Sequence, residues 1–261
     1  MRFDRMSGLD SEQLDELTDR VAAVLKNPWD SGTGRPKDLT LREAIIVSSG
    51  YARQNIIEEV WAEIFGTSQP TISRVLTDIT PLIDKVTAQF RPGAEQARTA
   101  ASGQTVLVDG FLAPCWSWHG AADLWSGKHK TTGFNSQVIS NLAGDIIFVS
   151  EPVTGHNHDM TALRETETAE VIAAAFSAIG DKGYQGSGYI TPIKKPQCRE
   201  LLEWENEFNA DVSRLRAPVE RAIAHIKSWR ILHTDYRRPL RTYLTSFRAA
   251  IGLYFFKLAY E

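Results

Sequence analysis

Three carboxylates stand out because of where they fall in the apolar pattern of the chain. Asp109 directly follows the run TVLV, Asp181 follows AFSAIG, and Glu220 lies in a later segment rich in arginine and lysine. An acid at the end of a buried strand is costly unless it has a partner. Carboxylate oxygens are the ligands that Mg²⁺ and Mn²⁺ prefer, and these cations keep open positions for water and phosphate. The pattern predicts that Asp109, Asp181 and Glu220 hold a divalent cation.

Positive charge surrounds Glu220 in the sequence. Between Arg214 and Arg248 there are nine basic residues and two acids, Glu220 and Asp235. Such a segment attracts phosphate backbones, although a solvated helix face has the same composition. The lone Glu220 has two interpretations at this point. It forms an ion pair within one helix, or it holds a cation beside side chains that bind a polyanion.

The whole chain gives no general sign of a nucleic-acid partner, because its net charge is -3 over 261 residues. With 43% apolar and 23% charged residues it is typical of a globular protein with room for two domains. Its two cysteines, Cys115 and Cys198, form no CxxC pair, which favours a reducing compartment. No stretch of eighteen residues is uncharged and apolar, so we expect a cytoplasmic protein without a membrane segment.

The segment IIEEVWAEIFGTSQPTISRVLTDI predicts a helix-turn-helix. Ala62 would let two helices approach, Gly66 would take the turn, and Ile72 and Val75 would dock the second helix. Three helices packed only for stability would show the same spacing. If the motif binds DNA, the side chains at the start of its recognition helix are the cap Ser68 and the groove residues Gln69, Thr71, Ser73 and Arg74.

Hydrophobic periodicity changes from helical to strand-like after about residue 100. Residues 1–92 are predicted to be helical, the polar segment RPGAEQARTAASG is interpreted as a linker, and residues 104–261 begin with strands and end with helices. We expect strands over TVLVDGFLAP, FNSQVISN, DIIFVSEPV, AFSAIG and YITPIKK, and one helix over MTALRETETAEVIAAAF. The predicted class is an α/β domain preceded by an all-α domain.

Five motifs in order resemble those of DDE-class transposases of bacterial insertion sequences, close to insertion-sequence family five and the Harbinger-type transposases of eukaryotes. They are VLVDGF around Asp109, SGKHKTTGFNSQV, GHNHDMTAL, GDKGYQG around Asp181, and FNADVSRLRAPVERAIAHIK. The last contains the family's R-x3-E-x6-K signature as Arg216, Glu220 and Lys227. The match departs at Ser213, where the family often has tyrosine, a difference that bears on strand transfer more than on metal binding.

The resemblance implies an enzyme that binds the terminal inverted repeats of its element and cleaves and joins double-stranded DNA. Its catalytic domain would be ribonuclease H-like, a mixed sheet flanked by helices. Asp109 would lie on the first strand, Asp181 beside the fourth, and Glu220 on a helix. The three acids would hold two Mg²⁺ or Mn²⁺ ions about 3.5 to 4 Å apart.

The same resemblance implies the partners. Terminal-repeat and target DNA would contact Arg216 and Lys227, and the protein would act in the bacterial nucleoid as a homodimer or larger assembly on DNA. Lys128 and Lys130 come before a predicted strand, where they would either contact DNA phosphate or belong to a solvated turn. Two other functions keep the same motifs. One is a domesticated or defective DNA-binding or regulatory protein, and the other is a metal-dependent nuclease that does not join DNA ends.

Other residues have competing interpretations. His156, His158 and Asp159 are spaced like zinc ligands but lack a nearby third nitrogen or sulfur. Asp159 could instead cap the helix that begins MTAL, or Asp159 and His158 could form a secondary part of the active site. Trp116 and Trp118 would stack on unpaired bases or pack in a core. The final apolar helix, YLTSFRAAIGLYFFKLAY, predicts core packing, with a dimer interface as the alternative.

Overall fold

The computed structural model describes residues 4–30, 36–116 and 121–261 and shows two compact units. Unit 1 comprises Met1–Arg91 and Lys227–Glu261, and unit 2 comprises Pro92–Ile226. These units differ from the expected domains at the C-terminal end, because residues 227–261 pack with the N-terminal helices. The assignment of DNA binding and catalysis to separate domains stays a prediction.

Unit 1 is helical, and its core lies between apolar helix faces. Its helices are α1 (Asp4–Ser7), α2 (Ser11–Val24), α3 (Leu41–Gln54), α4 (Glu58–Phe65), α5 (Gln69–Thr87) and α10 (Tyr243–Ala259), with short 3₁₀ turns η1 (Ala88–Phe90), η4 (Arg230–Leu232) and η5 (Leu240–Thr242). α10 packs along α5, and both contact α3. Tyr243, Phe247 and Phe256 of α10 are buried. Core packing of the final helix is therefore confirmed.

The connection between α4 and α5 has the backbone that its sequence predicts. Gly66 ends α4 in the left-handed region at φ 63° and ψ 35°, a conformation that suits glycine. Ile72 and Val75 of α5 are buried, as expected for the docking side of a second helix. A further close approach occurs at Gly50 of α3, where a Cβ would collide with the buried ring of Trp61. Whether this arrangement is a DNA-binding motif stays a prediction.

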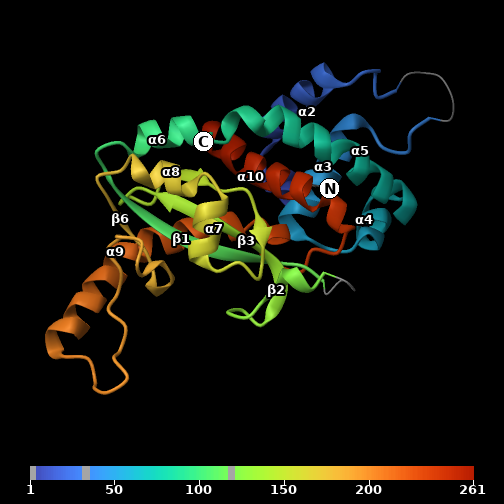
Figure 1. The fold of residues 1–261 in the computed structure, drawn as a ribbon. Coiled ribbons are helices and arrows are strands. Elements are labelled where there is room, and N and C mark those ends of the chain that lie inside the picture. The colour runs from blue at the N-terminus through green and yellow to red at the C-terminus, as the bar shows by residue number, and fades with distance from the viewer. Residues whose placement is uncertain (1–3, 31–35, 117–120) are drawn as a thin grey trace. The chain divides into compact units, whose positions relative to one another are not determined.

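Unit 2 is built around a mixed sheet (Figure 1). Its strands are β1 (Thr105–Pro114), β2 (Trp125–Ser126), β3 (Thr131–Ser140), β4 (Ile146–Val149), β5 (Val153–Thr154) and β6 (Ser177–Ile179). Its helices are α6 (Ala94–Ala101), α7 (Asp159–Glu165), α8 (Thr168–Ala173) and α9 (Glu203–Lys227), with 3₁₀ turns η2 (Ala122–Leu124) and η3 (Lys182–Tyr184). β1 pairs antiparallel with β3 and parallel with β6, while β2, β4 and β5 also pair with β3. The predicted mixed α/β class is confirmed.

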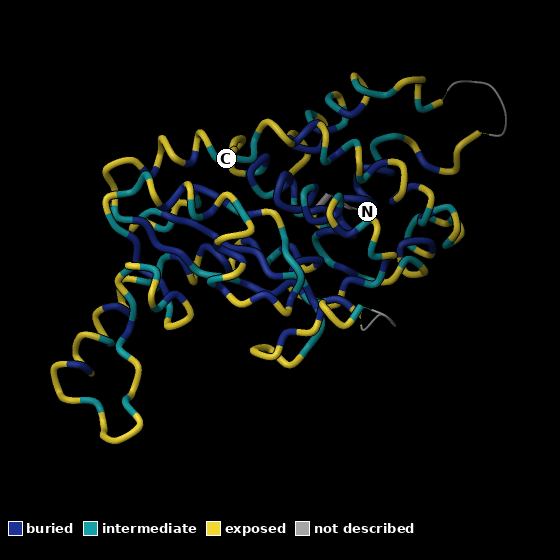
Figure 2. The backbone as a smooth tube through the Cα atoms, viewed as in Figure 1, coloured by how far each residue is buried: buried dark blue, intermediate teal, exposed yellow. Residues whose placement is uncertain are grey.

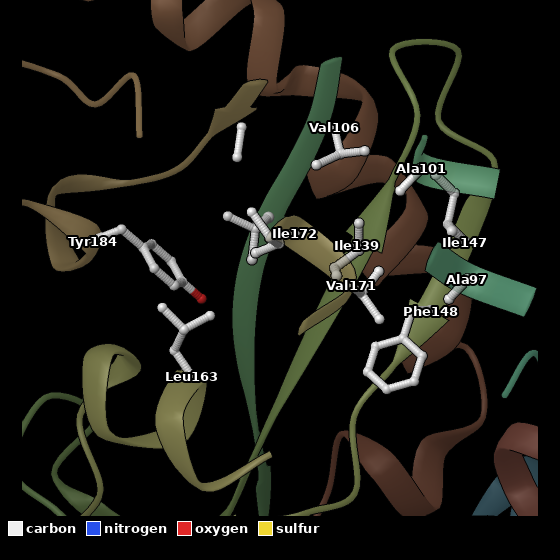
Figure 3. Packing of buried hydrophobic residues seen from close by; sticks show 12 residues of the cluster. Ala97, Ala101, Val106, Ile139, Ile147, Phe148, Leu163, Val171, Ile172 and Tyr184 are labelled. Carbon is white, nitrogen blue, oxygen red and sulfur yellow. The ribbon is translucent and has the colours of Figure 1, made fainter. Parts of the chain in front are cut away.

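The core of unit 2 lies between one face of this sheet and α6, α7 and α8 (Figure 3). Val106 and Val108 of β1 contribute to this core, and α8 contributes Val171 and Ile172. Because successive side chains on a strand alternate between faces, Asp109 belongs to the opposite face from Val108. The alternation therefore places Asp109 on the face of β1 that points away from this core, the face that also carries the buried side chains of Leu107 and Phe111.

Three local predictions for unit 2 are wrong. The expected linker contains α6, because its alanines favour a helix and Gln96 accepts a hydrogen bond from the N–H of Gly93 at the helix start. The expected single helix is divided into α7 and α8 at Thr166, whose backbone is extended. YITPIKK contributes only an isolated bridge at Ile190, and Pro192 removes a donor that a strand would need.

None of the helices in the described ranges has the length and apolar character required to cross a bilayer.

Candidate active site

The parallel pairing of β1 with β6 brings Asp109 and Asp181 to the same end of the paired parts of two neighbouring strands. Thr105 pairs with Ser177 and Leu107 with Ile179, so each β6 residue follows its β1 partner by 72 positions. Asp109 and Asp181 have the same separation, and each lies two residues beyond the last of these pairs. Asp109 and Asp181 therefore lie at the same end of the paired parts of these strands, and the charge of Asp181 contributes to the raised pKa of Asp109.

Lys128, in the turn between β2 and β3, lies among the aspartates. Its Nζ is 2.9 Å from Asp159 Oδ2 and 3.6 Å from Asp181 Oδ2. Burial lowers the pKa of Lys128, but the hydrogen bond to Asp159 and the charges of Asp159, Asp181 and Asp109 outweigh it, so the pKa is raised. Lys128 therefore neutralises the acids in this structure, and its contact with DNA stays a prediction.

Asp159 is the buried acid of this group. It is the first residue of α7, after the N-cap His158, so the predicted capping role of Asp159 is wrong. Its carboxylate lies instead against two glycines. A Cβ on Gly110 would be 3.0 Å from Asp159 Oδ1, and a Cβ on Gly183 would collide with Asp159 Oδ2. The glycines of VDGF and GDKG therefore leave space for this carboxylate. The exposed His158 makes no capping hydrogen bond through its side chain.

Arg216 of α9 joins Asp109 to Glu220. Arg216 Nη2 lies 2.7 Å from Asp109 Oδ2, and Nη1 lies 3.8 Å from Glu220 Oε1. The Arg216 and Asp109 side chains are 11% and 16% exposed, whereas that of Glu220 is 57% exposed. Glu220 thus forms the intrahelical ion pair that was one of its two interpretations. Arg216 of this pair also contacts Asp109 of β1.

Burial raises the pKa of Asp109 to about 6. The charge of Arg216, the N–H of Gly110 and the charge of Lys128 act in the opposite direction, while the charge of Asp181 adds to the rise. The carboxyl group therefore lies where negative charge is poorly compensated even with two cations nearby.

The predicted metal ligands do not form a closed cage. Within residues 4–30, 36–116 and 121–261, no group of three or more His, Cys, Asp or Glu side chains is arranged to hold a metal ion. Lys128 lies between Asp159 and Asp181, and Arg216 lies between Asp109 and Glu220. Coordination by Asp109, Asp181 and Glu220 stays a prediction. The same finding gives no zinc group at His156, whose Nδ1 lies 2.8 Å from the Asp123 carbonyl oxygen.

Gln137 and Tyr184, which were not among the predicted site residues, support this group. Gln137 Nε2 donates hydrogen bonds to the Asp159 carbonyl oxygen and the Tyr184 hydroxyl, both at 2.9 Å. Burial raises the pKa of Tyr184 well above its usual value, and the charges of Asp159, Asp109 and Asp181 add to this. Their position within the motifs FNSQV and GDKGYQG was the available signal for both residues.

The residues predicted to read DNA lie at the start of α5. Ser68 is the N-cap, but its hydroxyl makes no capping hydrogen bond and lies 3.0 Å from Thr71 Oγ1. Gln69 donates its amide to Glu58, so this side chain is engaged within unit 1. Ser73 is half-buried, and Arg74 is exposed with its Nε 3.1 Å from the Pro70 carbonyl oxygen. Arg74 is therefore the most accessible charged candidate on this helix turn.

The other predicted DNA contacts belong to different elements. Lys130 is exposed and has a left-handed backbone with φ 53°. Lys227 is the last residue of α9. Trp116 is 53% exposed, so it is not a core residue, while Trp118 lies outside the described residues. DNA contact at these positions stays a prediction.

Residues 108–254 match the family model of the DDE superfamily endonucleases. The chain belongs to this family. It is 28% identical to a protein named as a transposase for insertion sequence element IS112 from Streptomyces albus G, over 87% of this chain and 83% of that protein. It is 25% identical to a protein named as a probable transposase for insertion sequence element IS702 from Microchaete diplosiphon, over 99% of this chain and 95% of that protein. No solved structure matches the chain significantly. The resemblance to bacterial insertion-sequence transposases is confirmed.

The raised pKa of Asp109 predicts a pH-dependent stability in chelator. Between its unfolded value of 3.8 and its folded value of about 6, the folded protein binds more protons, so this group's contribution to stability falls as pH rises. The wild type should therefore lose stability relative to Asp109→Asn as the pH rises from 4 to 7. The change in the difference between their unfolding free energies should be up to about 3 kcal/mol. Urea unfolding followed by circular dichroism measures it, and a constant difference would contradict the burial of this charge.

Proposed function

We propose that the chain is a DNA transposase that binds the ends of its insertion sequence and performs divalent-metal-dependent cleavage and strand transfer. The observation that supports this most is the parallel pairing of β1 with β6, which has Asp109 and Asp181 at the same end of the paired parts of two neighbouring strands in a member of the DDE endonuclease family. Both relatives are named as insertion-sequence transposases. The homodimer or larger assembly on DNA is part of the same proposal.

The topology of unit 2 supports a ribonuclease H-like catalytic fold. Asp109 lies on the first strand, and β1 is central, with an antiparallel neighbour on one side and a parallel neighbour on the other. If the two-residue strands β2 and β5 are left aside, β6 is the fourth strand, and Asp181 follows it. Glu220 lies on α9, whose Arg216 reaches Asp109.

The donor atoms fit Mg²⁺ or Mn²⁺, because they are carboxylate oxygens in a place where negative charge is poorly compensated. Asp109, Asp181 and Glu220 would hold the metal, with two ions expected and Asp159 and His158 as secondary members. Bound divalent ions would activate a water or a 3′-hydroxyl and stabilise the departing oxygen. Both the identity and the number of ions belong to the proposal.

The chain's own cations would hold the acids and the DNA. Arg216 lowers the pKa of Asp109 and so favours its ionised form near neutral pH. Lys128 is 48% exposed, so its ammonium can exchange a carboxylate for a DNA phosphate. Lys130 and Lys227 would also contact the DNA backbone. Positioning and neutralisation of charge are the main requirements of phosphoryl transfer.

Strand transfer provides the test of this function. A labelled element end with a precut 3′-hydroxyl, a supercoiled target and Mg²⁺ should give joined product with the purified chain, and chelator should prevent it. Nicking without joining would identify the alternative nuclease. Specific binding to the ends without either reaction would identify a domesticated DNA-binding protein.

The start of α5 is proposed to read the terminal repeats, because it follows the Gly66 turn and presents the exposed Arg74. If Arg74 contacts a base, Arg74→Ala should weaken binding to an element end by about 1–3 kcal/mol. If Arg74 contacts a phosphate instead, the variant should reduce the slope of log binding constant against log salt concentration by about 1. Fluorescence anisotropy at several salt concentrations measures both. Lys85→Ala is the control, since Lys85 is exposed in the last turn of the same helix. Equal effects of the two variants would contradict recognition by the start of α5.

A further inference from the structure

The N-terminal half of α9 carries an exposed apolar stripe that the proposed function does not use. Trp204, Phe208 and Leu215 are 58%, 37% and 48% exposed. At 3.6 residues per turn these positions fall on one side of the helix. Figure 2 shows most of this half of the helix and the segment before it as exposed. A large aromatic residue that is more than half exposed within such a stripe is typical of a surface that binds a partner.

The neighbouring segment covers a different side of α9. Asn209 accepts a hydrogen bond from the N–H of Ile193 at 2.7 Å, and Arg199 binds both oxygens of Glu205 at 2.6 and 2.7 Å. Val212, on this side as well, is buried. The helix is therefore held in place through one side, which leaves the stripe accessible on a supported element.

The charges on α9 do not suit a nucleic acid at this place. From Glu203 to Leu215 the helix has four acids and one base, Arg214. Glu205 is neutralised by Arg199, but the remaining acids still outnumber Arg214. Repulsion between these acids and phosphate makes a protein partner the better fit.

The charges do suit a second copy of the same helix. Glu203 and Glu207 lie near the N-terminal end of one flank of the stripe, and Arg214 lies near the C-terminal end of that flank. When two such helices pair antiparallel about a two-fold axis, equivalent flanks meet in opposite directions. Glu207 of each copy then comes within reach of Arg214 of the other, and Trp204 packs against Leu215.

We propose that the stripe of Trp204, Phe208 and Leu215 is a self-association surface through which two copies of this chain pair their α9 helices antiparallel. Asp211, in the middle of the stripe, already forms an ion pair with Arg214 and so enters the interface with its charge compensated. The exposed Arg214–Asp211 pair contributes little to the monomer, so Arg214 can also contact Glu207 of the other copy at little cost. The pairing is symmetric, as a homodimer requires.

Sedimentation velocity of the full chain without DNA tests this pairing. A contact of three helical turns is small, so the wild type should dimerise only weakly, over roughly 5 to 200 µM. Trp204→Glu should weaken dimerisation at least about 10-fold, since an aromatic anchor is replaced by a charge. Ser213→Glu, an exposed residue on the opposite side of the same helix, should leave the dimerisation constant unchanged. Circular dichroism confirms that each variant is folded.

A charge exchange gives the second arm of the experiment. Arg214→Glu alone should weaken the dimer, and the double variant Glu207→Arg with Arg214→Glu should restore it, because the opposite charges again face each other across the two-fold axis. A folded wild type that stays monomeric throughout, or a dimer that Trp204→Glu leaves intact, overturns the proposal. Loss of DNA binding in Trp204→Glu with no change in mass would show that this surface binds DNA instead.

Discussion

Replacement of Asp109 by asparagine is expected to reduce metal-dependent nicking of an element end by more than about 100-fold, since loss of a metal ligand's hydrogen-bonding partner alone commonly costs about 10- to 100-fold. The amide keeps the size of the side chain but removes the negative charge that would face the cation. Asp181→Asn and Glu220→Gln should have effects of the same order. The measurement is the initial rate of nicking of a labelled duplex in Mg²⁺.

Binding of the element end should persist in these variants, because the residues proposed to read DNA lie at the start of α5. Asp145→Asn is the matched control, an exposed acid in the turn between β3 and β4 of the same unit. Unreduced nicking by Asp109→Asn would contradict the assignment of the site. If Asp109→Asn reduces nicking but Glu220→Gln keeps full activity, only the assignment of Glu220 as the third ligand is wrong. Asp159 would then be the next acid to test.

The second large effect is expected at Arg216. Arg216→Leu removes the nearest cation from the largely buried Asp109, and loss of one partner of a buried ion pair commonly costs about 3–5 kcal/mol. We expect about 3 kcal/mol at pH 7.5. The loss should fall to about 1 kcal/mol at pH 5, where Asp109, with a folded pKa of about 6, is mostly protonated and only a hydrogen bond is lost. Urea unfolding at the two pH values measures this.

Arg214→Leu is the matched control, because it makes the same change two residues away on α9. Arg214 is 79% exposed and pairs with an exposed acid, so its loss should change the unfolding free energy by less than about 0.5 kcal/mol. The comparison is made at protein concentrations where the chain is monomeric. Equal losses in the two variants, or a loss at Arg216 that does not vary with pH, would contradict the buried pairing with Asp109.

Local signals in the sequence were informative where neighbouring residues decide the structure. The left-handed turn at Gly66 and the buried positions Ile72 and Val75 follow from the need for a glycine and from helical spacing. Strand β1 follows from its β-branched and apolar run. The prediction failed over residues 94–101, because the proline and glycine before them suggested a linker, while the alanines that follow form α6 on the sheet.

For the candidate site, the sequence supplied the acids but not their neighbours. Asp109 and Asp181 are 72 residues apart, as are the paired residues of β1 and β6. This separation indicates that the two acids are close only once the pairing of the strands is known. Nothing in the local sequence indicates that Lys128 reaches Asp159 and Asp181.

By itself, the sequence determined the family, the order of its motifs and the acidic residues within them, because these depend on residue identity and spacing. The tertiary structure decided which groups meet. It paired Arg216 with both Asp109 and Glu220, left Glu220 more than half exposed, and placed residues 227–261 in unit 1. The physical reason is that strand register and helix packing arise from contacts between distant segments, whereas hydrophobic periodicity reports only the local face of each element.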